Sequence, residues 1–242
     1  MTLLLLAGTS EARELARVLA ASGVPAIASL AGATRAPKPI KLPLRTGGFG
    51  GEAGFRAYLL EAGITAVLDA THPFAHRISH RTARVCHEKS IPYCQFLRPE
   101  WAPGPGDRWT FVASEEAVAA HIPAGATVFL ATGRQTLDRF ANLSHAHVIC
   151  RQIDAPDRPF PLARGRFLVG RPPFSTEDEI RLFQGLGIDW LVAKNAGGPA
   201  SRAKLDAARR LGLNVAMIAR PPQPDAPRVA TLAAALDWVA RL

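Results

Sequence analysis

Short apolar runs alternate with amphipathic stretches along the N-terminal part of the chain. Apolar side chains recur at helical spacing between residues 12 and 20, whereas the flanking runs are short and continuous. Such alternation is typical of βαβ units in a parallel sheet. The pattern predicts strands over Leu3–Leu6, Ala26–Leu30, Ile40–Leu44, Ala66–Ala70 and Pro92–Leu97, and helices over residues 12–20 and Glu52–Ala62.

A second alternating series follows a segment rich in Pro and Gly, Arg98–Gly106, which is typical of a linker or hinge. Its predicted strands are Trp109–Ala113, Thr127–Ala131, His147–Gln152, Phe167–Gly170, Trp190–Lys194 and Asn214–Ala219, and its predicted helices are Thr176–Leu186 and Ala200–Leu211. We therefore expect an α/β fold of two Rossmann-like lobes, residues 1–98 and 99–242, with mainly parallel sheets and a ligand cleft between them.

Composition narrows the class of protein. Hydrophobic residues make up 48% of the 242 residues, which argues against disorder, and no uncharged apolar stretch is long enough to span a membrane. The apolar run at the start is short and lacks a basic region before it, so we do not expect a signal peptide. The three cysteines form no C-x-x-C pair. These features predict a cytoplasmic protein with buried thiols and no structural zinc.

A net charge of +9 makes nucleic acid the first partner to consider. The positive charge is mostly arginine, spread along the chain without long basic runs and without a recognisable nucleic-acid motif. Arginine suits carboxylates and phosphates, so a small polyanionic ligand fits at least as well. Genome composition is the alternative source of this arginine bias. We expect no nucleic-acid partner.

The first strand passes directly into Gly8, Thr9 and Ser10 and then into a helix that carries Arg13. A tight Gly turn at a helix start exposes backbone N–H groups, and the helix dipole favours a phosphate there. The sequence departs from G-x-G-x-x-G, because Ser10 and Arg13 occupy the places of the second and third glycines. Arg13 could alternatively lie on the helix surface.

Other strand-end loops carry the remaining candidates, since open α/β sheets bind ligands there. The first is the stretch Asp69–Ala75, which can line a flat ligand such as nicotinamide; alternatively Asp69 and Thr71 only cap the next helix while His72 bonds the backbone. His72, His76 and His80 recur every four residues, but no third ligand type joins them, so we expect no metal site.

A cation follows several other strands. Arg35 stands where an acidic residue would recognise the ribose of NAD, which favours NADP(H), although a surface arginine is the alternative. The second series adds candidates for binding substrate or cofactor: Thr132, Gly133, Arg134, Arg171, Ser175, Lys194, Asn195 and Gly197. These cationic strand ends suggest a polyanion. For Gly197 the alternative is an ordinary left-handed turn.

Several catalytic motifs are missing: there is no G-x-S-x-G, no P-loop, and neither tyrosine has a lysine four residues later. The motifs that are present, Gly8–Arg13, Asp69–Ala75, Thr132–Arg134 and the stretch 194–198, resemble from end to end those of the precorrin-6A reductase family of corrin biosynthesis. D-A-T-H-P-F-A is the most specific of them.

The resemblance implies that NADPH delivers hydride to a double bond of the precorrin-6A macrocycle, giving dihydroprecorrin-6. The proton comes from the substrate itself or from solvent, with His72 as the one candidate catalytic side chain. Gly8, Thr9, Ser10 and Arg13 would face the phosphates, Arg35 the 2′-phosphate, and Thr71, His72, Pro73, Phe74 and Ala75 the nicotinamide. In place of the missing glycines, the hydroxyls of Thr9 and Ser10 would supply phosphate contacts. The acetate and propionate arms of the substrate would explain the cations of the second lobe. Transient contact with neighbouring pathway enzymes is a further expectation.

Three alternatives stay open at this stage. The substrate could be the cobalt-containing macrocycle of the anaerobic pathway, because the motifs do not distinguish it from the metal-free one. The chain could be a two-lobed nucleotide-binding module without catalysis. A basic nucleic-acid-binding protein is the third, and it would bind random duplex DNA in a salt-sensitive manner.

Overall fold

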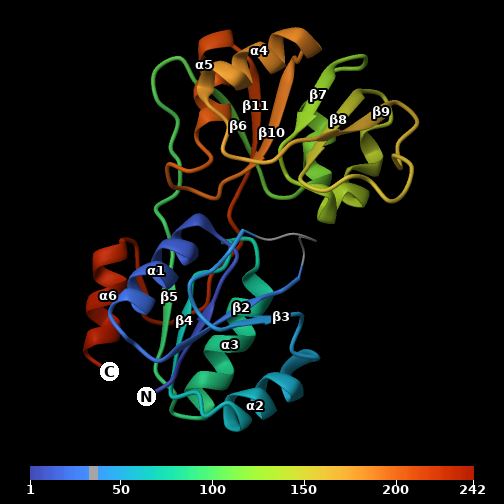
Figure 1. Cartoon of the computed structure of the whole chain (residues 1–242). Helices are drawn as coiled ribbons and strands as arrows, with labels where there is room; N and C mark the ends of the chain where they lie inside the picture. The colour runs from blue at the N-terminus through green and yellow to red at the C-terminus, as the bar shows by residue number, and fades with distance from the viewer. Residues whose placement is uncertain (33–37) are drawn as a thin grey trace. The chain divides into compact units, whose positions relative to one another are not determined.

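The computed structural model describes residues 1–32 and 38–242. The chain divides into two compact units, of which the first comprises residues 1–99 and 221–242 and the second residues 100–220. Within the part of the chain described, each unit is built on one six-stranded sheet in which every pairing is parallel (Figure 1). The predicted α/β class with mainly parallel sheets is confirmed.

The sheet of the first unit has the strand order of a dinucleotide-binding fold. In spatial order its strands are β3 (Leu44–Thr46), β2 (Ala26–Leu30), β1 (Leu3–Leu6), β4 (Ala66–Asp69), β5 (Tyr93–Phe96) and β12 (Arg228–Val229). Its helices are α1 (Ser10–Ala21), α2 (Gly51–Glu61), α3 (His76–Glu88) and α6 (Leu232–Ala240). The strand order reverses between β1 and β4, where loops diverge to opposite sides.

Alternation along β1 explains why helices cover both faces of this sheet. Leu3 and Leu5 pack with α1 and α6, whereas Leu4 and Leu6 pack with α2 and α3. All four leucines are almost wholly buried. A central parallel strand buried on both faces reads as a continuous apolar run, which is why the pattern of the first residues predicts this strand so clearly.

The second sheet repeats the same core order. Its strands in space are β9 (Gly165–Val169), β8 (His147–Gln152), β7 (Thr127–Leu130), β10 (Trp190–Lys194), β11 (Asn214–Ile218) and β6 (Arg108–Val112). Helices α4 (Thr176–Leu186) and α5 (Ala203–Leu211) pack on one face, and the 3-10 helices η1 (Glu116–His121) and η2 (Arg134–Leu143) complete the unit. Here the order reverses between β7 and β10.

The C-terminal residues correct the predicted domain boundary at residue 98–99. The first crossing between the units lies there, but residues 221–242, expected in the second lobe, return to the first unit. There β12 pairs with β5, and Ala235 and Val239 of α6 enter the core beside α1 (Figure 1). This return depends on a two-residue strand, which has no periodicity to detect in the sequence.

The edge strand β3 lies later in the chain than expected. Residues 40–44 were the predicted span, whereas the strand covers Leu44–Thr46 and pairs with β2 from Ala28 onward. Pro39 and Pro43 have no N–H to donate to the ladder. The carbonyl of Pro43 nevertheless accepts a hydrogen bond of 2.8 Å from the N–H of Ala28.

Hydropathy along the helices is moderate throughout. Searched over the residues that the structure describes, none of them has the length and apolar character of a membrane span.

Gly54 in the first unit and Gly185 in the second offer a matched pair for testing the packing around α2. A Cβ on Gly54, within α2, would lie 1.8 Å from the carbonyl oxygen of Phe49, whereas a Cβ on Gly185, within α4, would meet nothing within 4 Å. We expect Gly54→Ala to lower the free energy of unfolding by about 1–3 kcal/mol or more, because backbone must move. Gly185→Ala should raise it by about 0.5–1 kcal/mol through helix propensity. Urea denaturation measures the free energy of unfolding of both variants. Equal changes would contradict the close approach of Gly54 to the backbone of Phe49.

Candidate functional site

The turn between β1 and α1 leaves backbone N–H groups open at the carboxyl edge of the first sheet. Gly8 has φ +140°, and no atom lies within 4 Å of where a Cβ would stand. The N–H of Ala12 is capped by the hydroxyl of Thr9 at 3.1 Å. Within the described chain the N–H groups of Ser10 and Glu11 have no acceptor. Open N–H groups at a helix start favour an anion.

The charges around this turn also favour an anion. Arg13 is half-buried in the first turn of α1, and its guanidinium has no hydrogen-bond or ion-pair partner among residues 1–32 and 38–242. Glu11, which would repel a phosphate, is paired with Arg98 at 2.5 Å, and both side chains are largely buried. The site therefore keeps one available cation after its carboxylate has been neutralised.

The hydroxyls of the turn are engaged within the protein instead of facing outward. Thr9 donates to the carbonyl of Ala70 at 2.9 Å, and Ser10 donates to the carboxylate of Glu11 at 3.0 Å. A hydroxyl has one hydrogen to donate, so neither can also donate to a phosphate in this arrangement. In this arrangement the backbone N–H groups are the donors left open, and phosphate contacts from these two hydroxyls stay a prediction.

Asp69 is the buried anchor of the neighbouring loop. It ends β4, is fully buried, and accepts hydrogen bonds from the N–H and hydroxyl of Thr71 at 3.0 and 2.7 Å and from the hydroxyl of Tyr93 at 2.9 Å. A buried carboxylate needs such partners, because leaving it unpaired is costly. Asp69 and Thr71 therefore shape the loop, but neither caps α3, whose N-cap residue Ala75 has no side-chain hydrogen bond to the helix.

The residues after Thr71 form a tight turn held at both ends. His72 is exposed, and its Nδ1 accepts from the N–H of Phe74 at 3.2 Å, while its carbonyl accepts from the N–H of Ala75 at 2.7 Å. The carbonyl of Pro73 accepts from the side chain of Gln223 at 3.0 Å, so the returning C-terminal segment supports this turn. The ring of Phe74 lies 5.7 Å from that of His72.

These two loops meet at the point where the strand order of the first sheet reverses. β1 and β4 are paired neighbours, and the bond from Thr9 to Ala70 joins the loops that follow them. Ligands of open α/β sheets bind at such switch points. The structure thus brings together Gly8, Thr9, Ser10 and Arg13 with the stretch 71–75. Arg35 lies outside the described residues.

Several ionisable groups nearby are held protonated. Burial, reinforced by the charge of Asp69, raises the pKa of Tyr93 far above its usual range. Burial also raises the pKa of Cys86 to about 12 and that of Cys94 to about 11. At neutral pH these thiols are unreactive and none of the three groups is a ready proton donor.

In the second unit each predicted cation at a strand end has a carboxylate partner. Arg134 lies 3.4 Å from Asp157, and Arg171 lies 3.5 Å from Asp154. Lys194, at the end of β10, lies 3.2 Å from the buried carboxylate of Glu115 and donates to Thr136 at 3.1 Å. These contacts compete with any ligand, so the cations are less available than the sequence suggests.

The other predicted residues of this unit divide into two groups. Ser175 forms a capping box with Asp178 at the start of α4, and Gly197 has φ +70°, the left-handed turn considered as its alternative. In contrast, the buried hydroxyl of Thr132 has no partner in the described chain, and Gly133 has open space where a Cβ would stand. Thr132 and Gly133 follow β7, which pairs with β10 at the switch point of this sheet.

Asn195 has a structural task that the sequence does not reveal. Its side chain is fully buried and accepts from the N–H of Trp101 at 2.9 Å. Its amide nitrogen donates to the carbonyl of Trp101 at 3.1 Å and to the carboxylate of Glu100 at 3.2 Å. Arg220 donates to the carbonyls of Asn195 and Ala196. Both connections between the units are therefore fastened at this loop.

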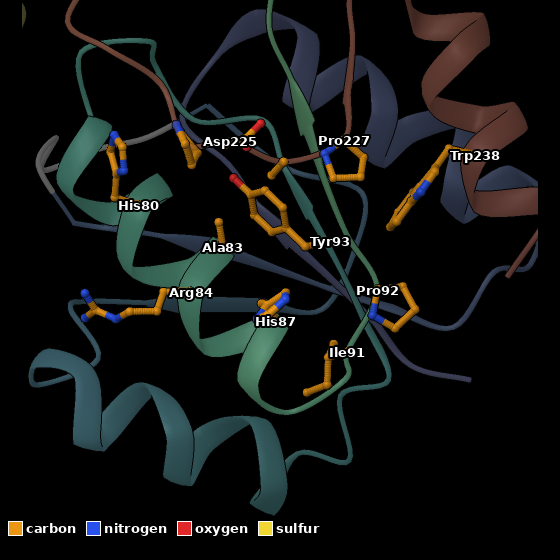
Figure 2. Close-up of a pocket in the computed structure, with 12 residues that line it drawn as sticks. His80, Ala83, Arg84, His87, Ile91, Pro92, Tyr93, Asp225, Pro227 and Trp238 are labelled. Carbon is orange, nitrogen blue, oxygen red and sulfur yellow. The ribbon is translucent and has the colours of Figure 1, made fainter.

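A cavity of about 500 Å³ lies on the flank of the first unit, between α3 and the C-terminal segment (Figure 2). Tyr93, Pro227 and Trp238 line it, with His80 and Asp225 at its rim. It lies beside β5, and its lining residues include none from the loops that follow β1 and β4. His80 contacts the carbonyl of Pro222 at 3.0 Å, so this histidine supports the C-terminal segment.

The sequence reasoning missed two residues that shape the site. Arg98 neutralises Glu11, and Glu115 neutralises Lys194. Glu11, an acidic residue at the start of the first predicted helix, indicates that a cation lies nearby. That cation, Arg98, comes far later in the chain, so its position cannot be predicted from the spacing of residues.

Comparison with known proteins identifies the family that shares this sequence and fold. Residues 2–240 match the family described as "Precorrin-6x reductase CbiJ/CobK". The chain is 44% identical to the precorrin-6A reductase of Rhodobacter capsulatus, over 98% of this chain and 95% of that protein. It is 29% identical to the cobalt-precorrin-6A reductase of Priestia megaterium, over 90% of each chain. A solved structure titled "CobK precorrin-6A reductase" is 43% identical, covers 100% of this chain and 96% of that one, and superposes with a TM-score of 0.96.

Asn195 provides the test of the anchoring role. We expect Asn195→Ala to lower the free energy of unfolding by about 2–4 kcal/mol, since the buried N–H and C=O of Trp101 each lose a partner. Asn142→Ala removes a single exposed hydrogen bond to the carbonyl of Glu116 and should change it by no more than about 0.5 kcal/mol. Urea denaturation measures the free energy of unfolding of both variants. An Asn195→Ala protein as stable as the Asn142→Ala control would contradict the anchoring role of Asn195.

Proposed function

This chain belongs to the precorrin-6x reductase family, and from that premise we propose that it reduces precorrin-6A with a hydride taken from NADPH. The reaction is a reduction at a carbon–carbon double bond of the macrocycle in cobalamin biosynthesis. NADPH as the donor, the residues that bind it and the source of the proton are the parts proposed here.

The observation that most favours a dinucleotide cofactor is the open anion site at the start of α1. Gly8 leaves space, the N–H groups of Ser10 and Glu11 lack acceptors within the described chain, and Arg13 brings a guanidinium without a partner there. A pyrophosphate supplies the acceptors and the charge that these groups need. The residues present therefore fit the cofactor. Arg35, after β2, is proposed to bind the 2′-phosphate and so to favour NADPH over NADH.

When bound, NADPH supplies the hydride. The protein holds the two reactants in position, which by itself accounts for a large part of a rate enhancement. The turn 72–75 borders the nicotinamide in this proposal, and its rigidity has a stated origin: Asp69 fixes its start, and Gln223 supports Pro73. Phe74 offers a flat apolar surface at this point.

Four described side chains near the turn 72–75 are poor proton donors. His72 Nδ1 is occupied by the N–H of Phe74, and Tyr93 and the thiols Cys86 and Cys94 stay protonated well above neutral pH. A conjugated, nitrogen-rich macrocycle can accept or relay protons itself. We therefore propose that the proton comes from the substrate or from solvent.

The substrate side of the proposal rests on the second unit. Thr132 and Gly133 stay open after β7, and the cations Arg134, Arg171 and Lys194 surround the strand ends even though carboxylates of the protein partner them. Carboxylate arms of precorrin-6A are proposed to compete for them. The identity of 44% with a precorrin-6A reductase, against 29% with a cobalt-precorrin-6A reductase, favours the metal-free macrocycle. Three free, buried cysteines suit the cytoplasm.

Cofactor binding is tested with three arginine variants. Upon mixing with precorrin-6A, NADPH should lose its nicotinamide absorbance in proportion to the substrate consumed. Arg13→Gln should raise the KM for NADPH and for NADH about tenfold each, since both carry a pyrophosphate. Arg35→Ala should raise only the KM for NADPH, because only NADPH has a 2′-phosphate.

The matched control is Arg17→Gln. Arg17 lies on the same helix, is exposed, and pairs with Glu14, so its loss changes the net charge equally without touching the turn. Unchanged kinetics of Arg13→Gln, or an equal effect of Arg17→Gln, would overturn the proposed phosphate site.

His72→Asn tests the source of the proton. Asparagine can still accept from the N–H of Phe74 but cannot donate a proton at neutral pH. Single-turnover hydride transfer should stay within about threefold of the unsubstituted protein, a change below the factor of about 10²–10⁴ that general acid catalysis contributes. If transfer falls by that larger factor while both ligands bind normally, the proton comes from His72 and the proposal of a substrate or solvent donor is wrong.

A further inference from the structure

One lysine of the second unit lacks the carboxylate that the neighbouring cations have. Lys204 lies in the first turn of α5, is half-buried, and forms no ion pair with the residues described. Its Nζ donates to the carbonyl of Ser201 at 2.6 Å and stands 5.4 Å from the ring centre of Trp101. An ammonium group has three hydrogens to donate, so two of them have no acceptor within residues 38–242.

The carboxylate whose charge acts on Lys204 is already committed to another cation. Glu179 is buried and binds Arg151 through two hydrogen bonds of 2.8 Å each. Arg151 also stacks on Phe174, 4.2 Å from its ring centre, and on Phe129 at 5.0 Å. Two cations thus share one carboxylate in a partly dry environment, and the group keeps a net charge of about +1.

The pKa of Lys204 reflects the lack of a carboxylate paired with its ammonium group. Burial, and then repulsion by Arg151, lowers the pKa of Lys204 to about 8, while Glu179 acts in the opposite direction. Below pH 8 the lysine remains mostly protonated, but holding that charge costs free energy of folding. A cation that destabilises the fold and that forms no ion pair with any described residue is a candidate for ligand binding.

We propose that Lys204 forms a carboxylate-binding subsite that takes one acetate or propionate arm of the substrate. This inference rests on the proposed function. The ligand supplies the second negative charge, which balances Arg151, Glu179 and Lys204 together. Trp101, whose indole N–H is fixed to the carbonyl of Gly198 at 2.8 Å, limits the positions that the ammonium group can take. A phosphate of the nucleotide shares this chemistry, and the experiment separates the two sources.

The test compares Lys204→Met with Lys204→Arg. Methionine keeps the length of the chain and removes the charge, whereas arginine retains the charge. Lys204→Met should raise the KM for precorrin-6A and the Kd for precorrin-6A without NADPH by about tenfold or more, with the KM for NADPH unchanged. Lys204→Arg should recover most of the loss. The midpoint of thermal unfolding of Lys204→Met should equal or exceed that of the unsubstituted protein, which shows that the variant folds.

The control is Arg210→Gln on the same helix, an exposed cation paired with Glu177, which changes the net charge equally and should leave both constants unaltered. A macrocycle with methyl-esterified carboxylates should bind the unsubstituted and Lys204→Met proteins equally. The inference is overturned if Lys204→Met binds precorrin-6A as tightly as the unsubstituted protein does, or if the variant raises only the KM for NADPH. It is also overturned if Lys204→Met weakens binding of the methyl ester as much as it weakens binding of the free acid. If the unsubstituted protein does not reduce precorrin-6A at all, the proposed function fails instead.

Discussion

The buried amide of Asn195 is the interaction that fastens both connecting segments of the chain to the second unit. It holds Glu100 and Trp101, where the chain enters the second unit, while Arg220, where the chain leaves, donates to the carbonyl of Asn195 itself. Entry and exit are therefore fastened to one strand-end loop. A buried amide with these partners tolerates little displacement, because every lost bond leaves a polar group without a partner.

The same physical rule governs the first unit. Asp69 is buried at the end of β4 and holds Thr71 and Tyr93, and Thr9 joins the two loops at the switch point through the carbonyl of Ala70. Polar residues at strand ends thus serve two purposes. Those that are buried and fully bonded build the loops, whereas Arg13 and Thr132 have side-chain groups without a partner among the described residues and are the ones proposed to bind ligand.

This division explains what could be predicted from the sequence. The central strands and α4 were predictable because burial on both faces and a capping box are local signals, and β8, β10 and α4 match their predicted bounds. The return of residues 221–242 and the pairing of Lys194 with Glu115 were not, since both join residues far apart in the chain. For the same reason motifs located the strand-end loops, but they could not tell Asn195, which anchors the chain, from a residue that contacts ligand.

The direct transfer of hydride between two bound ligands is the central claim, and isotopic labelling measures it. NADPH with deuterium at the transferred position is mixed with precorrin-6A and the protein in ordinary water. Mass spectrometry then measures the mass of the reduced product. The account predicts a product that has gained one deuterium and one ordinary hydrogen. A product with two ordinary hydrogens, or no reduced product while the labelled NADPH persists, would contradict it.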